Sequence, residues 1–194
     1  MVKSCAGTPA MADDKVLLRR LQQGDQDALQ AIYAKYEATL LALAANLLDE
    51  PALAEDVLQD VLVTLVQSVH RLRIRRSLKG YLATAVANRA RDYYRRKPRQ
   101  QFVSIDQAGY LAASEEGPFQ MVIRSEQVEK ARAAMVELPY EQREAIVLRL
   151  HADMKFREIA KVQHVSVKTA LSRYRYGLDK LRAMLNGEVR DERD

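Results

Sequence analysis

Cysteine, tryptophan and helix-breaking residues are scarce in this chain. Its 194 residues include one Cys, no Trp, five Pro and seven Gly. A lone thiol at Cys5 cannot form an internal disulfide, so nothing in the sequence requires an oxidising compartment. Scarce Gly and Pro favour long helices, because these two residue types most often interrupt them.

Long apolar runs are missing as well. No stretch of about 18 uncharged apolar residues occurs, and the first residues lack the apolar core of a signal peptide. Hydrophobic residues make up 48% of the chain and charged residues 29%, a balance typical of globular proteins. Together with the single thiol, these features predict a cytoplasmic protein.

Recognisable catalytic and ligand-binding motifs are also absent. The chain has three His, no Gly-rich phosphate loop, no His-Glu-x-x-His and no nucleophile elbow. Asp56 and Asp60 stand four residues apart, but no further carboxylate or His joins them in sequence to complete a site. The sequence therefore predicts a protein that is not an enzyme, binds no cofactor or metal and takes no small-molecule substrate.

Positive and negative charges occupy separate, neighbouring segments. Residues 49–60 carry five acidic side chains and no basic one, whereas residues 70–101 carry a net charge of +10. Such opposed patches predict two partner surfaces, an acidic one for a protein and a basic one for nucleic acid. Tyr81, Tyr93 and Tyr94 lie among the cations, and this mixture suits single strands whose unpaired bases stack on rings. The alternative is a solvated basic face with Tyr81 in the core.

Apolar residues recur every three or four positions through most of the chain, which predicts helices. Asp25 is expected to cap the second helix, residues 70–79 to form a basic loop, and Pro98 to end the helix before it. No segment alternates as a strand does, so the predicted fold is all-α. We expect two small helical domains, at 15–97 and 124–186, joined by a flexible linker at 98–123, with disordered tails at 1–14 and 187–194.

Residues 156–175 have the pattern of a helix-turn-helix. Ile159 and Ala160 supply the apolar and small positions of the first helix, Val165 fills the turn, and Ser166 is placed to cap the second helix. The alternative is an ordinary amphipathic hairpin, which two departures favour: Gln163 and His164 stand where an apolar residue and Gly are usual. His164 is interpreted as a turn residue that accepts a positive φ.

Five segments, in order, resemble the extracytoplasmic-function sigma factors, the small two-domain bacterial factors that direct RNA polymerase to promoters. The segments are residues 24–36, 54–66, 81–96, 138–150 and 156–175. The resemblance implies core RNA polymerase and promoter DNA as partners, an anti-sigma factor as a regulator, and a role in stress-responsive transcription. Tyr81 and Leu171 depart from the family's usual Trp and basic residue.

The resemblance also implies roles for individual residues. Core polymerase would be bound through Asp56, Gln59 and Asp60. The minus-ten element would be bound through Arg73, Arg75, Arg76, Lys79, Asn88, Arg89, Arg91, Asp92, Arg95 and Arg96. The minus-thirty-five element would be bound through Ser166, Lys168, Thr169, Ser172, Arg173 and Arg175.

The sequence thus predicts a sigma factor that binds core polymerase and directs promoter-specific initiation. It would bind the minus-ten element as a melted single strand and the minus-thirty-five element as a duplex. Two alternatives remain open at this point. One is a dimeric helix-turn-helix regulator that acts without core polymerase, and the other is an interaction protein whose basic helices bind RNA or an acidic partner.

Overall fold

The computed structural model describes residues 9–50, 52–72, 77–96 and 118–186, with side chains from residue 13 onward and, in the last range, from residue 126 onward. Helices make up most of the described ranges and no strand occurs in them, which confirms the all-α prediction. The helices are α1 (Pro9–Gln22), α2 (Gln26–Leu47), α3 (Leu53–Ser68), α4 (Leu78–Arg96), α5 (Pro118–Val136), α6 (Tyr140–Leu150), α7 (Phe156–Val162) and α8 (Val167–Leu185), with a 3₁₀ turn, η1, at Val69–Arg71. None of the helices in these ranges is long and apolar enough to cross a membrane.

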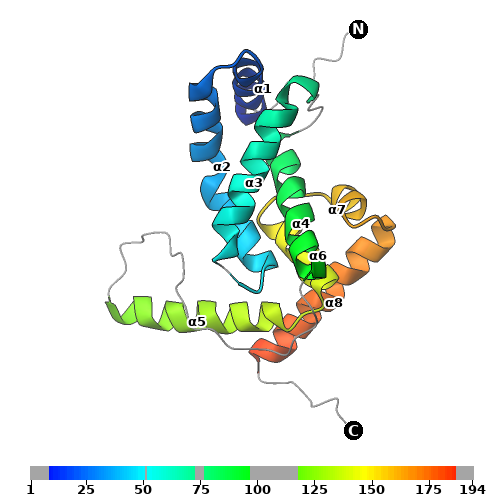
Figure 1. The fold of residues 1–194 in the computed structure, drawn as a ribbon. Coiled ribbons are helices and arrows are strands. Elements are labelled where there is room, and N and C mark those ends of the chain that lie inside the picture. The colour runs from blue at the N-terminus through cyan, green and yellow to red at the C-terminus, as the bar shows by residue number, and fades with distance from the viewer. Residues whose placement is uncertain (1–8, 51, 73–76, 97–117, 187–194) are drawn as a thin grey trace.

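Helices α1 to α4 pack together as the N-terminal domain (Figure 1). In α2, residues such as Ile32, Leu40, Leu43 and Leu47 recur at helical spacing and are almost fully buried. In α3, the buried face runs along the predicted apolar stripe, whose buried members are Ala54, Val57, Leu58, Val61 and Leu65. The predicted segregation of an apolar and a polar face in this helix is therefore confirmed.

The break between α1 and α2 lies where the sequence predicts it. Gly24 has a φ of +86°, a left-handed conformation that glycine adopts without strain. The Asp25 carboxylate accepts hydrogen bonds from the backbone N–H groups of Asp27 (3.0 Å) and Ala28 (3.4 Å). Asp25 is thus the N-cap of α2, as expected.

The prediction of a disordered tail at 1–14 is partly wrong, because α1 begins at Pro9 and residues 9–14 are helical. Asp14 is buried against α2, where its carboxylate accepts hydrogen bonds from the Tyr36 hydroxyl and from Lys35 Nζ at 2.8 Å. Lys35 Nζ also donates to Asp13 at 2.7 Å. These polar contacts add to the burial of Leu17, Leu18 and Leu21 in holding α1 on the domain, and a search for apolar periodicity cannot detect them.

The predicted basic loop is shorter than expected, because α4 begins at Leu78 and includes Gly80. Ser77 Oγ accepts a hydrogen bond from the Gly80 N–H at 3.3 Å, which satisfies one amide of the first turn. Leu78 is buried, so this turn packs into the core rather than standing free. The start of α4 therefore follows from a local cap and a buried side chain.

The C-terminal domain comprises α5 to α8, and α5 begins earlier than predicted. Residues 118–123, which the sequence assigned to the linker, are helical. Pro118 is no obstacle there, because the first residue of a helix has no intrahelical partner for its N–H. Helices α6, α7 and α8 pack around Ile159, which is fully buried, and Ala160, as the helix-turn-helix pattern predicts.

A close crossing of α6 and α8 depends on Gly177. A Cβ built there would lie 2.8 Å from Ile146 Cδ1 and 3.2 Å from Gln142 Cβ. Overpacking of this kind costs about 1–3 kcal/mol, which exceeds the roughly 1 kcal/mol that Ala gains over Gly in helix propensity. We expect Gly177→Ala to lower the free energy of unfolding by about 1 kcal/mol in urea denaturation.

Gly80→Ala is the matched control for this change. The nearest atom to a Cβ at Gly80 is Ser77 Cβ at 3.8 Å, an ordinary contact. The free energy of unfolding of this variant should be unchanged or slightly higher, because only helix propensity changes. Equal stability of the Gly177→Ala and Gly80→Ala proteins would show that the crossing of α6 and α8 has room to relax.

Candidate nucleic-acid interface

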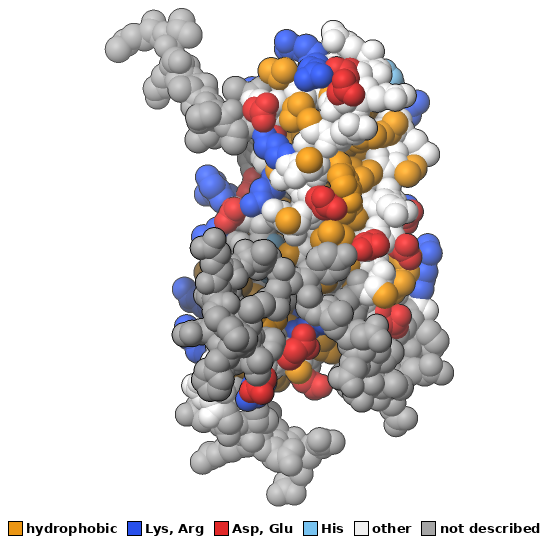
Figure 2. Space-filling model, turned by 90° about the vertical axis from the view of Figure 1, so that its left-hand side faces the viewer, with side chains coloured by type: hydrophobic (Ala, Val, Ile, Leu, Met, Phe, Trp, Pro, Cys, Tyr) orange, Lys and Arg blue, Asp and Glu red, His pale blue; other side chains and the backbone are white. Residues whose placement is uncertain are grey.

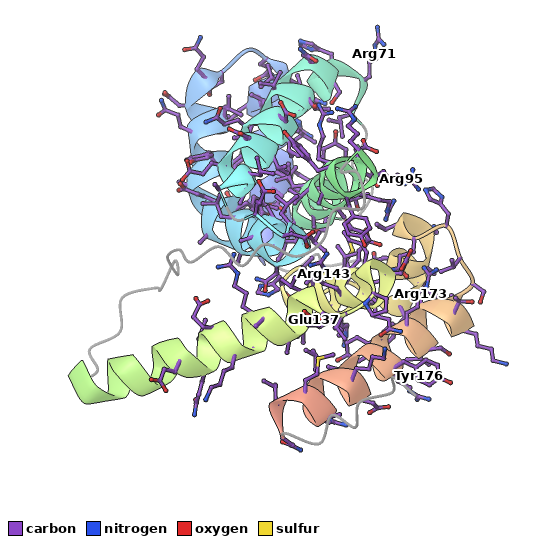
Figure 3. The ribbon with its side chains drawn as sticks, turned by 60° about the horizontal axis from the view of Figure 1, so that its bottom comes forward. Arg71, Arg95, Glu137, Arg143, Arg173 and Tyr176 are labelled. Carbon is purple, nitrogen blue, oxygen red and sulfur yellow. The ribbon has the colours of Figure 1, made fainter. Side chains whose placement is uncertain are left out.

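Hydrogen bonds from α1 hold η1, the 3₁₀ turn that precedes the predicted single-strand surface. Gln22 Nε2 donates hydrogen bonds to the carbonyl oxygens of Val69 (3.0 Å) and Leu72 (3.2 Å), on either side of the exposed Arg71. Arg71 and Arg95 project on the same side of the N-terminal helices (Figure 3). Arg73, Arg75 and Arg76 lie outside the described residues, so their predicted role remains a prediction.

The predicted minus-ten residues of α4 divide into an exposed group and a paired group. Asn88, Asp92, Arg95 and Arg96 are exposed. Positions 88, 92 and 95 follow steps of four and three, so they share one stripe of the helix. The stripe is exposed to solvent, and within it Asn88 Oδ1 accepts a hydrogen bond from Arg91 Nη1 at 3.3 Å.

Arg89 of α4 forms an ion pair with Asp60 of α3. Its Nε lies 3.4 Å from Asp60 Oδ2, with 41% and 49% of the two side chains exposed. An exposed pair of this kind contributes little to stability and exchanges readily for another partner. It joins one residue predicted to bind the minus-ten element to one predicted to bind polymerase, so the two surfaces are neighbours.

Lys79, Arg91 and the nearby Tyr94 face the C-terminal domain. Arg91 Nη2 lies 2.6 Å from Glu144 Oε1 and donates to the Val162 carbonyl at 3.1 Å. Lys79 Nζ lies 2.6 Å from Asp153 Oδ2. The Tyr94 ring stacks on Tyr140 with centroids 4.7 Å apart. Arg91 is therefore engaged mainly with protein, since only 15% of its side chain is exposed, whereas Lys79 and Tyr94 touch the C-terminal domain and stay accessible, with 28% and 47% exposed.

The Glu144 carboxylate pairs with Arg91 in a buried site, where only 1% of the Glu144 side chain is exposed. Burial raises the pKa of the Glu144 carboxyl, and the Arg91 charge opposes that shift. The exposed Asp153 behaves differently, because its hydrogen bond to Lys79 lowers the pKa of its carboxyl. Burial and the nearby Lys79 charge lower the pKa of His151 in the same region.

The turn of the predicted helix-turn-helix has the expected geometry. His164 has a φ of +53°, which confirms that it takes the position where Gly is usual. Ser166 is the N-cap of α8, and its Oγ accepts a hydrogen bond from the Thr169 N–H at 3.0 Å. Val165 packs against the core, as expected. The turn therefore accommodates both of its unusual residues.

Gln163 is buried because it satisfies all of its polar groups. Its Nε2 donates to the Glu141 carbonyl at 2.8 Å and to Glu144 Oε2 at 3.0 Å. Its Oε1 accepts a hydrogen bond from Arg173 Nη1 at 3.0 Å. The Gln163 amide, at a position where an apolar residue is usual, thus connects α6, the turn and α8.

The predicted minus-thirty-five residues lie together on the first turns of α8. Ser166, Lys168, Thr169 and Arg175 are exposed, and Ser172 and Arg173 are partly exposed. Tyr176, which we did not predict as a site residue, is 65% exposed and continues the stripe formed by positions 169, 172 and 173 (Figure 3). Its seven-residue spacing from Thr169 is the sequence signal that identifies it.

The predicted polymerase-binding residues lie on the outer side of α3. Asp56 and Gln59 are exposed, and Asp60 is partly exposed. Val63 and Val66, also missed by the sequence prediction, are exposed by 54% and 42%. Positions 56, 59, 63 and 66 form one stripe, acidic at its start and apolar at its end. Figure 2 shows that apolar side chains also gather in a band on one face of the N-terminal domain, with acidic side chains beside it.

Two family models match the chain in order, and they cover the two domains separately. Residues 32–100 match the model described as Sigma-70 region 2. Residues 129–181 match the model described as Sigma-70, region 4. The matched ranges contain the α3 stripe, α4 and the helix-turn-helix.

Curated relatives and solved structures agree with these matches. The chain is 27% identical over 173 residues to RNA polymerase sigma factor CarQ of Myxococcus xanthus, covering 89% of this chain and 97% of the relative. It is 26% identical to RNA polymerase sigma factor CnrH of Cupriavidus metallidurans, covering 90% and 95%. The fold is similar to that of CnrH in complex with the cytosolic domain of CnrY, with a TM-score of 0.68, 22% identity and coverage of 91% and 99%.

The cap at Ser166 is directly testable. Ser166→Ala removes the acceptor for the Thr169 N–H and should lower stability by about 1 kcal/mol. We expect faster hydrogen exchange at the Thr169 amide, measured by NMR on the full chain. Ser166→Asp retains an acceptor and should keep the slow exchange, so fast exchange in both variants would contradict the cap.

Proposed function

Because the chain belongs to the extracytoplasmic-function group of the sigma-70 family, we propose that it binds core RNA polymerase and directs initiation at specific promoters. The family consists of non-enzymatic, DNA-binding factors for transcription initiation. The observation that carries the proposal is the ordered match of regions 2 and 4, each on a domain whose exposed surface suits its expected partner.

Polymerase docking is assigned to the α3 stripe. Asp56 and Gln59 offer acceptors at one end, and Val63 and Val66 offer apolar surface at the other. A partner helix with basic and apolar residues would complement both halves, since apolar contact supplies affinity and opposite charge supplies orientation. The remaining predicted residue, Asp60, would exchange its exposed pair with Arg89 for a contact with polymerase.

Binding of the minus-ten element as a single strand is assigned to α4 and the basic segment before it. The exposed stripe of Asn88, Asp92 and Arg95 combines donors and an acceptor, which suits the edges and phosphates of unpaired nucleotides. Trapping an unstacked base costs a few kcal/mol, which pocket contacts offset. Promoter melting would then require no nucleotide hydrolysis.

Binding of the minus-thirty-five element as a duplex is assigned to α8. Lys168 and Arg175 are exposed cations that suit phosphates, while Thr169, Ser172 and Arg173 suit base edges in the major groove. Tyr176 would extend this contact by one turn. Two weak DNA-binding domains on one polymerase would select promoters by spacing as well as by sequence, because the first contact raises the effective concentration of the second.

We further propose an anti-sigma factor as a regulatory partner. One solved structure with a similar fold is named as such a complex: RpoE with the anti-sigma factor NepR from Bartonella quintana, with a TM-score of 0.61 and 20% identity over 81% of this chain and 98% of that one. The CnrH structure likewise contains a second protein, the cytosolic domain of CnrY. The exposed apolar and acidic surface of α3 would suit such a partner as well as polymerase.

Transcription in vitro with core polymerase on a library of genomic promoters tests the proposed function. We expect transcripts that start at a distinct promoter class only when this protein is added. Tight binding to palindromic duplexes without polymerase, together with no added transcription, would favour the dimeric regulator instead.

The docking assignment predicts that charge reversal on α3 weakens polymerase binding. Asp56→Lys replaces an acceptor by a cation and should reduce affinity for purified core polymerase about tenfold, since like charges across an interface cost about 1.4 kcal/mol or more. The matched control is Glu137→Lys, an exposed residue that follows α5 (Figure 3). Equal affinities of the α3 variant and this control would contradict the docking assignment.

The duplex assignment predicts a measurable change in salt dependence. Lys168→Ala removes one predicted phosphate contact and should reduce the slope of log affinity against log salt by about one. Binding of the holoenzyme to a promoter duplex would be measured over a salt series. Lys180→Ala removes the same charge from an exposed position further along α8 and serves as the control. Identical slopes in the two variants would place the DNA on another face.

A further inference from the structure

Gln163 is the least expected residue of the helix-turn-helix. It follows α7 as its C-cap, at a position where an apolar residue is usual, and it is buried, with 9% of the residue exposed. Burial of an amide is unfavourable unless both of its polar ends are hydrogen-bonded. Gln163 therefore constrains its neighbours in a way that an apolar residue of the same size would not.

Helix α6 fixes the direction in which the Gln163 amide points. Gln163 Nε2 donates to the Glu141 carbonyl at 2.8 Å and to Glu144 Oε2 at 3.0 Å, so both of its N–H groups are used. The reversed orientation would place the amide oxygen against a carbonyl oxygen and a carboxylate, where it has no donor. Gln163 Oε1 is consequently held toward α8.

This amide oxygen holds one nitrogen of the Arg173 guanidinium. Gln163 Oε1 accepts a hydrogen bond from Arg173 Nη1 at 3.0 Å. The acceptor is neutral, so the bond orients the guanidinium without pairing its charge, whereas a carboxylate there would compete with DNA for the same cation. The bond does not involve Nε and Nη2, which form a second edge of the planar group and can donate together to two acceptors.

Arg173 stands on α8 where an oriented guanidinium would face DNA. Positions 169, 173 and 176 follow steps of four and three, so the partly exposed Arg173 lies between the exposed Thr169 and Tyr176 on one stripe (Figure 3). Two donors on one planar edge match the O6 and N7 acceptors that guanine presents in the major groove. Of the four bases, guanine is therefore the one that this edge suits best.

A guanidinium that is already held loses less freedom when it binds a base. Arg has many rotamers, and ordering such a side chain at an interface lowers affinity. Part of this ordering is present before DNA binds, because Arg173 Nη1 is bonded to a buried amide whose own direction is set by two further hydrogen bonds. All of these groups belong to the C-terminal domain.

We propose that Gln163 is a positioning residue, which orients Arg173 toward a guanine of the minus-thirty-five element and thereby increases discrimination at one base pair. The base contact rests on the proposed function, whereas the orientation of Arg173 does not. The two are therefore tested by separate measurements.

NMR relaxation of the Arg173 Nε–H group tests the orientation in the free, full-length chain. We expect this group to be restricted in the wild-type protein and mobile in Gln163→Met, whose side chain has a similar length but no amide oxygen. Arg175, exposed on the same helix, is the internal reference for a mobile guanidinium. Wild-type Arg173 as mobile as Arg175 would overturn the proposal, and this comparison does not require the variant to fold. So would equal mobility of Arg173 in the wild-type and Gln163→Met proteins.

Binding of the holoenzyme to promoter duplexes tests the base contact, with each base pair of the minus-thirty-five element replaced in turn. Arg173→Lys keeps the charge but loses the planar fork, so it should reduce discrimination at one G·C pair roughly tenfold. Gln163→Met should reduce discrimination at the same pair about fivefold, because the guanidinium must then be ordered on binding. Gln127→Met makes the same replacement at an exposed position of α5 and serves as the control. Losses at different base pairs in the Arg173→Lys and Gln163→Met proteins would overturn the proposal.

A double-mutant cycle separates positioning from a purely structural role. Because Gln163 acts through Arg173, Gln163→Met should cause no further loss of discrimination in the Arg173→Lys background. Equal losses in both backgrounds, or weaker binding to every duplex with discrimination unchanged, would overturn the proposal. Promoter-specific transcription by Gln163→Met with unchanged discrimination would remove this role of Gln163 and leave the proposed function intact. A wild-type holoenzyme without promoter-specific binding would remove the proposed function, and the base contact with it.

Discussion

The organisation of this molecule depends on one buried carboxylate, that of Glu144. It accepts Arg91 from the N-terminal domain through one oxygen and Gln163 from the turn of the helix-turn-helix through the other. Because an unpaired charge in such a site is strongly destabilising, Glu144 requires these donors to be in place. The same carboxylate therefore holds the turn against α6 and contributes to the contact between the two domains, beside the Arg143–Asp49 pair and the packing of α2 on α6.

Helical periodicity accounts for most of the fold. The two faces of α3, the cap at Asp25 and the turn at His164 follow from spacing and local backbone chemistry, and all three are observed as predicted. The errors lie at element ends, where tertiary contacts decide. Asp14, at the end of the predicted tail, is buried with partners on α2, and Leu78, at the start of α4, is buried in the core. Neither contact has a signature within its own segment.

The candidate surfaces were less completely predictable, for a different physical reason. Periodicity indicates which face of a helix is polar, but it does not indicate whether that face contacts solvent, a ligand or another domain. Asn88 and Arg91 both lie on the polar side of α4, yet one is exposed and the other enters the second domain. Val63 and Tyr176 were missed because sequence reasoning assigns apolar and aromatic residues to the core. Both side chains are in fact largely exposed.

Gln163 shows why a departure from a motif requires a structural explanation. In isolation, an amide at an apolar position argues against a helix-turn-helix, since burying an unpaired amide is unfavourable. Here Glu144, the Glu141 carbonyl and Arg173 satisfy it completely. An apolar residue would fill the same space but would leave Arg173 and one oxygen of Glu144 without this partner. The unusual residue therefore connects Arg173 of α8 to the carboxylate that also accepts from Arg91 of α4.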